Sequence, residues 1–91
     1  MAPPPLIDDR LLAQAVPVKR SVTIAGHRSS ISLEAMFLRQ LQAAAARRGL
    51  SLNQLVSQID AIRSQNGGQS NLSAVLRAFI LKELTDRLDH R

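Results

Sequence analysis

The sequence predicts a small, mainly α-helical protein with a short β-ribbon, a fold of the α+β class. Two patterns lead to this prediction. Apolar and small polar residues alternate with period 2 between residues 19 and 33, which is typical of strands that bury one face. From residue 34 to residue 88, apolar residues instead recur every three or four positions, as in amphipathic helices. The 91 residues allow one domain, with residues 18–91 as its folded part.

Two strands are expected, at residues 19–25 and 28–33, with a turn at residues 25–28. Each alternates apolar residues with polar ones. Gly26 lies between them and is free to take a positive φ, so the two strands are predicted to form a hairpin.

Two helices joined by a glycine turn are expected next. The first spans about residues 34–48, and Gly49 is placed to end it in the left-handed conformation. The second begins at Ser51, which forms a capping-box pattern with Gln54. The apolar stripes of the two helices are Phe37, Leu38, Leu41, Ala44 and Ala45, and then Leu52, Leu55, Val56, Ile59 and Ile62.

A third helix is expected over about residues 71–88, after a polar linker that contains glycine. Glu83 is spaced to pair with Arg87 one turn further on. Lys82 is spaced in the same way to pair with Asp86. The apolar register of this helix is Leu72, Val75, Leu76, Phe79, Ile80, Leu84 and Leu88.

Residues 1–17 are predicted to be a flexible tail, because the opening is rich in proline. A short helix or docking segment within residues 6–15 is compatible with this pattern. The tail lacks the basic start and apolar run of a signal peptide, and no window approaches the roughly 18 apolar residues that cross a bilayer. A cytoplasmic protein without a membrane partner is therefore expected.

The positive charge is unevenly distributed. Three cations between residues 19 and 33, with a surplus of two between residues 34 and 49, account for the whole net charge of +5. A basic region of this kind is typical of proteins that bind nucleic acid or another polyanion. A solvated basic surface that maintains solubility is the simpler alternative.

The sequence offers no pattern of catalytic or metal-binding residues. There is no cysteine, and the two histidines, His27 and His90, are far apart without ligand or triad spacing. The acidic residues are scattered without a paired acid and base. We therefore expect neither an enzyme nor a metal or cofactor site.

The order of strand, helix, glycine turn and capped helix resembles the ribbon-helix-helix family of DNA-binding proteins. The resemblance covers residues 28–63, with RSSISL as the ribbon strand, EAMFLRQLQAAAARRG as the first helix and LSLNQLV as the start of the second. The run Gly-x-Ser-x-Asn from Gly49 to Asn53 is its most family-like local motif. The longer sequence is similar to a short bacterial subgroup with an added C-terminal helix.

The resemblance implies a homodimer, or a higher oligomer, in which the ribbon strands of two chains pair antiparallel. The two chains would share a core that contains Ile31, Leu33, Phe37, Leu41, Leu55 and Ile59. The additional strand at residues 19–25 would then flank the ribbon. Four strands about 4.8 Å apart are too wide for a major groove of about 12 Å, so flanking strands paired along their whole length would keep such a sheet out of the groove.

The resemblance also implies a double-stranded DNA interface. Alternate side chains of the ribbon would touch base edges in the major groove, here Arg28, Ser30 and Ser32. Phosphates would be contacted by side chains of the basic region and by the start of the second helix. These positions are Lys19, Arg20, Arg47, Arg48, Ser51, Leu52 and Asn53.

The function predicted from these features is that of a dimeric DNA-binding protein, a small bacterial transcriptional regulator. The alternative is a protein-interaction module on the same scaffold, antitoxin-like or an adaptor, without sequence-specific DNA binding. A protein partner would then bind the helix at residues 71–88, whose apolar face is wider than one small core needs.

Overall fold

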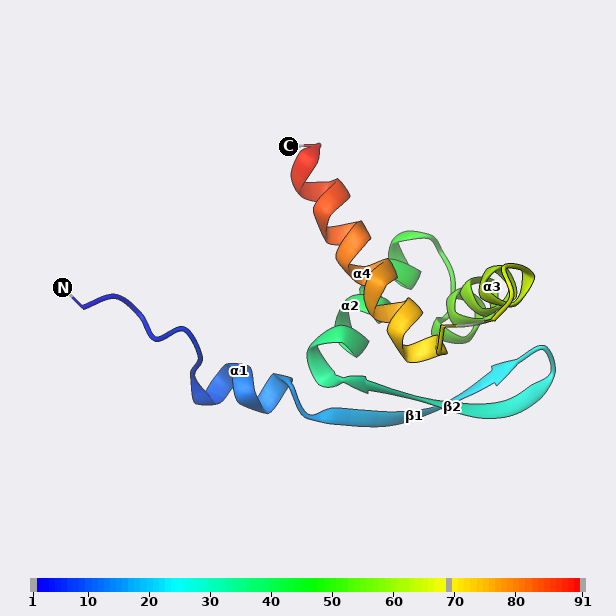
Figure 1. Ribbon diagram of the computed structural model, residues 1–91, viewed down its shortest axis with the longest axis horizontal. Helices are drawn as coiled ribbons and strands as arrows, with labels where there is room; N and C mark the ends of the chain where they lie inside the picture. Colours follow the sequence, from blue (N-terminus) through cyan, green and yellow to red (C-terminus); the bar gives the residue numbers. More distant parts are fainter. Residues whose placement is uncertain (1, 69, 91) are drawn as a thin grey trace.

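The computed structural model describes residues 2–68 and 70–90 of the chain. Its helices and strands are α1 Asp9–Gln14, β1 Pro17–Ile24, β2 His27–Glu34, α2 Ala35–Arg47, α3 Leu52–Gln65 and α4 Leu72–Asp89. The mainly α-helical fold with a short β-ribbon is therefore confirmed. Helices α2, α3 and α4 lie on one side of the hairpin, and α1 extends sideways from the start of β1 (Figure 1).

Strands β1 and β2 pair antiparallel along their whole length, from Pro17 opposite Glu34 to Ile24 opposite His27. The first strand thus begins two residues earlier than predicted. The two turn residues have positive φ angles, 51° at Ala25 and 80° at Gly26. This conformation is typical of type I′ turns, whose twist matches that of the flanking strands. The predicted hairpin and the role of its glycine are confirmed.

The core lies between the inner face of the hairpin and helices α2, α3 and α4. Each element contributes apolar side chains at the spacing of its own period, two in the strands and about 3.6 in the helices. The buried residues are Val22, Ile31, Leu33, Leu38, Leu41, Ala44, Ala45, Leu55, Val56, Ile59, Leu76 and Ile80. The hairpin therefore has one apolar face that is covered by helices and one face that is open to solvent.

The helix ends follow the sequence signals. Gly49, with φ 67°, ends the turn after α2. The Ser51 hydroxyl accepts from the Gln54 amide at 3.1 Å, and the Gln54 side chain accepts from the Ser51 amide at 2.8 Å, so the capping box is confirmed. At the start of α4, the Asn71 side chain accepts from the Ala74 amide at 2.8 Å.

Three residues of the apolar faces identified in the sequence lie outside the core. Ile62, Leu84 and Leu88 are exposed. The core ends at Ile59 on α3 and Ile80 on α4, and the later turns of both helices run past the elements that would cover them. No described helix is both long enough and apolar enough to cross a membrane.

One of the two predicted ion pairs of α4 is also wrong. Lys82 pairs with Asp86 at 2.8 Å as expected. Glu83 does not pair with Arg87 but with Arg48 at the end of α2, which offers it two hydrogen bonds. The planar guanidinium of Arg48 donates to both oxygens of the Glu83 carboxylate, a geometry that Arg87 on the same helix does not adopt here.

Candidate nucleic-acid interface

The open face of the hairpin carries six exposed side chains, which we call the ribbon face. Successive side chains point to opposite sides of a strand, so every second residue of β1 and its cross-strand partner share this face. Three cross-strand pairs make up the ribbon face, Lys19 with Ser32, Ser21 with Ser30 and Thr23 with Arg28. The fourth pair on this side, Pro17 with Glu34, lies at the open end of the hairpin, where Arg77 binds the Glu34 carboxylate. The helices cover the other face (Figure 1).

The structure brings the three predicted base-contacting residues together on the ribbon face. Arg28, Ser30 and Ser32 follow one another along β2 and are all exposed. Ser21 and Thr23 of β1 lie beside them and were not predicted, although the period-2 pattern, extended to the first strand, would have indicated them. The six side chains comprise two cations and four hydroxyls. They offer hydrogen bonds and positive charge to a polyanion without any carboxylate.

Helix hydroxyls satisfy one outward-facing backbone group on each edge of the hairpin. In an antiparallel hairpin, every second residue directs its backbone groups away from the partner strand. The Ser57 hydroxyl on α3 donates to the carbonyl oxygen of Thr23 on β1 at 3.1 Å. The Ser73 hydroxyl on α4 donates to the carbonyl oxygen of Ser32 on β2 at 3.0 Å. Each contact occupies one carbonyl oxygen to which an added strand could otherwise bind.

Arg20, a predicted phosphate contact, lies on the opposite side of the hairpin. It pairs across the strands with Ile31, whose side chain is in the core. Arg20 is exposed, but it points to the same side as the helices. The ribbon face therefore includes Lys19 and not Arg20.

Arg47 and Arg48, also predicted to contact phosphates, bind Glu83 within the chain. Arg48 donates to both Glu83 carboxylate oxygens, at 2.7 and 2.8 Å, and Arg47 approaches one of them at 3.6 Å. The Arg48 guanidinium also lies 5.3 Å from the centre of the Phe79 ring, a cation–π contact. The hydrogen bond from Arg48 is the main cause that lowers the pKa of the Glu83 carboxyl below its usual 4.5. These arginines join α2 to α4.

A second two-pronged ion pair joins the end of the ribbon to α4. Arg77 donates to the two carboxylate oxygens of Glu34 at 2.8 and 3.1 Å. These hydrogen bonds lower the pKa of the Glu34 carboxyl below its usual 4.5 and raise that of Arg77. Glu34 is the last residue of β2, so the pair helps to fix the hairpin relative to α4.

The start of α3, predicted to bind a phosphate, is occupied in part by its own cap. The capping box takes up the amides of Ser51 and Gln54. The Leu52 side chain is half-buried against the core, whereas Asn53 is exposed. The contribution of Ser51, Leu52 and Asn53 to DNA binding stays a prediction.

The residues predicted to form a shared dimer core are packed within one chain. Five of the six are buried there, namely Ile31, Leu33, Leu41, Leu55 and Ile59, and Phe37 packs against them half-buried. Strand β1 and helix α4 supply the cover that a second chain was expected to give. The antiparallel pair that the structure shows is β1 with β2, and sharing of this core between two chains stays a prediction.

The part of the chain that the structure describes holds no group of three histidine, cysteine or acidic residues able to bind a metal ion. His27 closes the hairpin turn opposite Ile24 and is exposed. The candidate site is a surface of hydroxyl and cationic groups on the hairpin.

Comparison with known proteins places this geometry in a family. A family model described as a ribbon-helix-helix domain matches residues 17–84, from β1 into α4. Among solved structures, an uncharacterized protein from Bordetella pertussis Tohama I is similar, with a TM-score of 0.77 and 25% sequence identity. The similarity covers 87% of this chain and 64% of that chain, less than two thirds of the latter. No curated protein matches. The chain belongs to the ribbon-helix-helix domain family.

Proposed function

We propose that this protein binds double-stranded DNA by placing the ribbon face in the major groove. The observation that carries the proposal is the set of six exposed cationic and hydroxyl side chains on the helix-free face of a two-stranded hairpin. Members of this family are generally DNA-binding transcription regulators or antitoxins, which supports the same function.

The width of the hairpin favours a ribbon made by a single chain. Two strands about 4.8 Å apart fit a major groove about 12 Å wide, whereas the outer strands of a four-stranded sheet would be roughly 14 Å apart. Because β1 pairs along all of β2, adding a second chain at the β2 edge would give four strands. The hydroxyls of Ser57 and Ser73 on the two edges also favour a hairpin that stays two-stranded.

Each side chain of the ribbon face has a role that fits its chemistry. Arg28 is long enough to donate two hydrogen bonds to a guanine edge, whereas Ser30 and Ser32 can pair with any base. Lys19, near the open end of the hairpin, is suited to a phosphate. As a homodimer in a bacterial cytoplasm, the protein would present two hairpins to two half-sites and regulate transcription there.

Selection of binding sequences from random duplexes, followed by titration at several salt concentrations, tests the proposal. Binding should be sequence-selective and should weaken as salt rises, because phosphate contacts release counterions. Ser30→Asp should abolish retention, since it puts a carboxylate on the ribbon face. Ser64→Asp makes the same change at an exposed position of α3 and should have little effect. A folded wild-type protein that binds no duplex at low salt would contradict the proposal.

The exposed leucines of α4 support a second function, that of a protein-interaction module without sequence-specific DNA binding. Leu81 and Leu88 of α4 are exposed, whereas Leu76 and Ile80 of the same helix are buried in the core. Purification from the native host with and without nuclease distinguishes the two functions. A stoichiometric protein partner that survives nuclease, with no nucleic acid, would favour this second one.

A further inference from the structure

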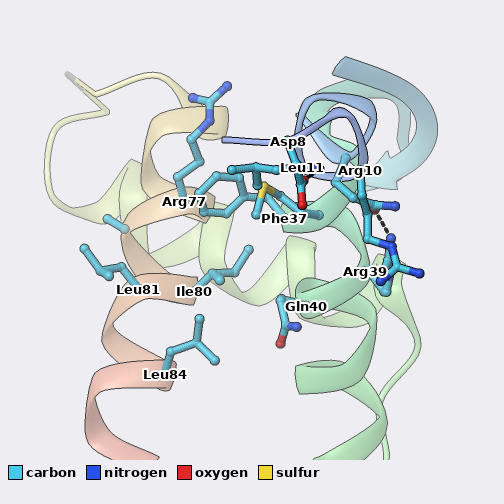
Figure 2. A pocket seen from close by; sticks show the side chains of 13 residues that line it. Asp8, Arg10, Leu11, Phe37, Arg39, Gln40, Arg77, Ile80, Leu81 and Leu84 are labelled. Carbon is cyan, nitrogen blue, oxygen red and sulfur yellow. Dashed lines mark hydrogen bonds between the residues drawn. The ribbon is translucent and has the colours of Figure 1, made fainter. Parts of the chain in front are cut away.

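Away from the ribbon face, the chain has an apolar hollow of about 680 Å³ between α1, α2 and α4 (Figure 2). Arg39 and Arg77 lie on either side of it. Both are engaged within the chain, Arg39 with Gln14 and Arg77 with Glu34. None of the six ribbon-face residues lines this hollow. The hollow therefore adds no group to the proposed DNA interface, and a preference among sequences depends on the ribbon face.

Thr23 and Arg28 each carry a group that the other ribbon-face side chains lack. Arg28 has the guanidinium, and Thr23 has the methyl group. The remaining four offer an ammonium or a hydroxyl, at Lys19, Ser21, Ser30 and Ser32. In the major groove, a guanidinium matches the two acceptors of guanine, and a threonine methyl group matches the C5 methyl group of thymine. Thr23 is therefore the ribbon-face residue suited to recognise thymine.

The register of the hairpin places these two side chains next to each other. Thr23 is the cross-strand partner of Arg28. The Thr23 carbonyl oxygen accepts from Ser57 outside the hairpin, so Thr23 and Arg28 form a pair without hydrogen bonds between them. The Cβ atoms of such a pair are about 4.5–5.5 Å apart, and successive base pairs of B-form DNA are about 3.4 Å apart. Side chains at this separation can contact two neighbouring base pairs.

The methyl group of Thr23 belongs to an exposed residue whose conformation is restricted. A β-branched side chain has few rotamers available to it. The backbone of Thr23 is held by the pairing of Val22 and Ile24 with β2, and by the Ser57 hydroxyl at 3.1 Å. Because the group is already ordered, little conformational entropy is lost when it meets a base.

We propose that Thr23 recognises a thymine in the base pair next to the guanine that Arg28 contacts. This role of Thr23 rests on the proposed function and specifies two neighbouring bases of each half-site. It assigns base recognition to β1, which lies outside the strand RSSISL that forms the ribbon in the family resemblance. Contact between the two methyl groups removes apolar surface from water, and losing one of them corresponds to about a fourfold change in affinity.

Deoxyuridine in place of thymine tests this role, because it removes only the C5 methyl group and keeps the base pair. Each thymine of a selected duplex is replaced in turn, and the affinity of the wild-type protein is measured. One thymine per half-site should be sensitive, with a loss of about fourfold. It should adjoin a guanine whose replacement by a deazaguanine without the N7 acceptor weakens binding by wild type but not by Arg28→Ala. Thr23→Ser, which removes only the methyl group of the protein, should bind the thymine and deoxyuridine duplexes equally.

Two further variants control for the substitution itself. Thr23→Val keeps a methyl group at this position and should still prefer thymine to deoxyuridine. Thr85→Ser makes the same change as Thr23→Ser at an exposed position of α4 and should bind as wild type does. If wild type selects no duplex, the proposed function is wrong, and the role of Thr23 with it. If wild type selects a duplex in which no thymine is sensitive, or if Thr23→Ser keeps the wild-type sensitivity, only the role of Thr23 is wrong.

Discussion

At the scale of single residues, the hairpin turn holds the clearest departure from local preference. Ala25 has a φ of 51°, and a residue with a Cβ is strained in this left-handed region. Gly26 has a φ of 80° without that strain, and a Cβ added there would meet nothing within 4 Å. The turn therefore keeps its shape although one of its two central residues is unsuited to it.

We predict that Ala25→Asn stabilises the protein by about 1 kcal/mol, because asparagine followed by glycine is the preferred pair for this turn. Urea unfolding followed by circular dichroism measures the change. Ala46→Asn, at an exposed position of α2, is the control. It should lower the free energy of unfolding by about 0.5 kcal/mol, because asparagine has a lower helix propensity than alanine. An Ala25→Asn variant no more stable than wild type would show that the turn relaxes away from the positive φ in solution.

The residue scale also shows what the sequence could reveal of the site. Period 2 correctly put Arg28, Ser30 and Ser32 on one strand face, and the same period puts Arg20 with the apolar residues of β1. It could not reveal that Arg48 is held by Glu83, which lies 35 positions away. A pairing of this kind depends on how α4 packs against α2, and no local pattern encodes it.

At the scale of secondary-structure elements, α4 is attached by two ion pairs, one to β2 and one to α2. In each, an arginine donates to both oxygens of a carboxylate. The folded-state pKa values of Glu34 and Glu83 are lowered from the usual 4.5, mainly by these hydrogen bonds. A carboxyl whose pKa is lower in the folded state than in the unfolded state stabilises the fold at pH values above its unfolded-state pKa. This stabilisation is lost as the pH falls through the folded-state pKa.

We therefore predict that the melting temperature is nearly constant above pH 5 and falls as the pH is lowered below about 4.5, the ordinary carboxyl pKa. The double variant Glu34→Gln/Glu83→Gln should have a lower melting temperature than wild type at neutral pH. Its melting temperature should also fall less than that of wild type when the pH is lowered. Thermal unfolding at a series of pH values measures both. Parallel pH profiles for wild type and the double variant would mean that the ion pairs contribute nothing to the acid sensitivity.

The elements and the hairpin were largely predictable, but the packing of the core was not. Apolar period, the capping box and Gly49 indicated both strands and α2, α3 and α4. Periodicity defines which face of a strand is buried and leaves open which strand lies beside it. The turn signal at Gly26 predicted the pairing of β1 with β2, whereas the burial of Ile31 and Leu33 without a second chain required the three-dimensional structure.

At the scale of the whole molecule, much of the positive charge serves the fold. Arg48 and Arg77 are held in two-pronged ion pairs, and Arg63 pairs with Asp60 at 2.7 Å. Lys19 and Arg28 are the cations of the ribbon face. The count of 12 lysine and arginine residues therefore overstates the number of cations available to DNA.

Lys19→Ala and Arg48→Ala should accordingly differ in their effect on DNA binding. Removing one phosphate contact reduces the slope of log affinity against log salt by about 0.9 per contact on B-form DNA. Lys19→Ala should show this reduction on selected and random duplexes alike. Arg48→Ala should leave the slope unchanged and lower the melting temperature. A reduced slope for Arg48→Ala would instead show that Arg48 contacts a DNA phosphate.

The central claim is that the face of a single-chain hairpin reads DNA sequence, and a comparison of Arg28→Ala with Arg20→Ala tests it most directly. Both variants remove one arginine from the same hairpin, Arg28 from the ribbon face and Arg20 from the opposite face. Affinities for a selected duplex and a scrambled one are measured at one salt concentration. Arg28→Ala should reduce the binding free energy by about 1–3 kcal/mol per half-site on the selected duplex and by much less on the scrambled one. Arg20→Ala should preserve the preference for the selected duplex over the scrambled one. Equal losses on both duplexes for Arg28→Ala, or a lost preference for Arg20→Ala, would contradict the claim.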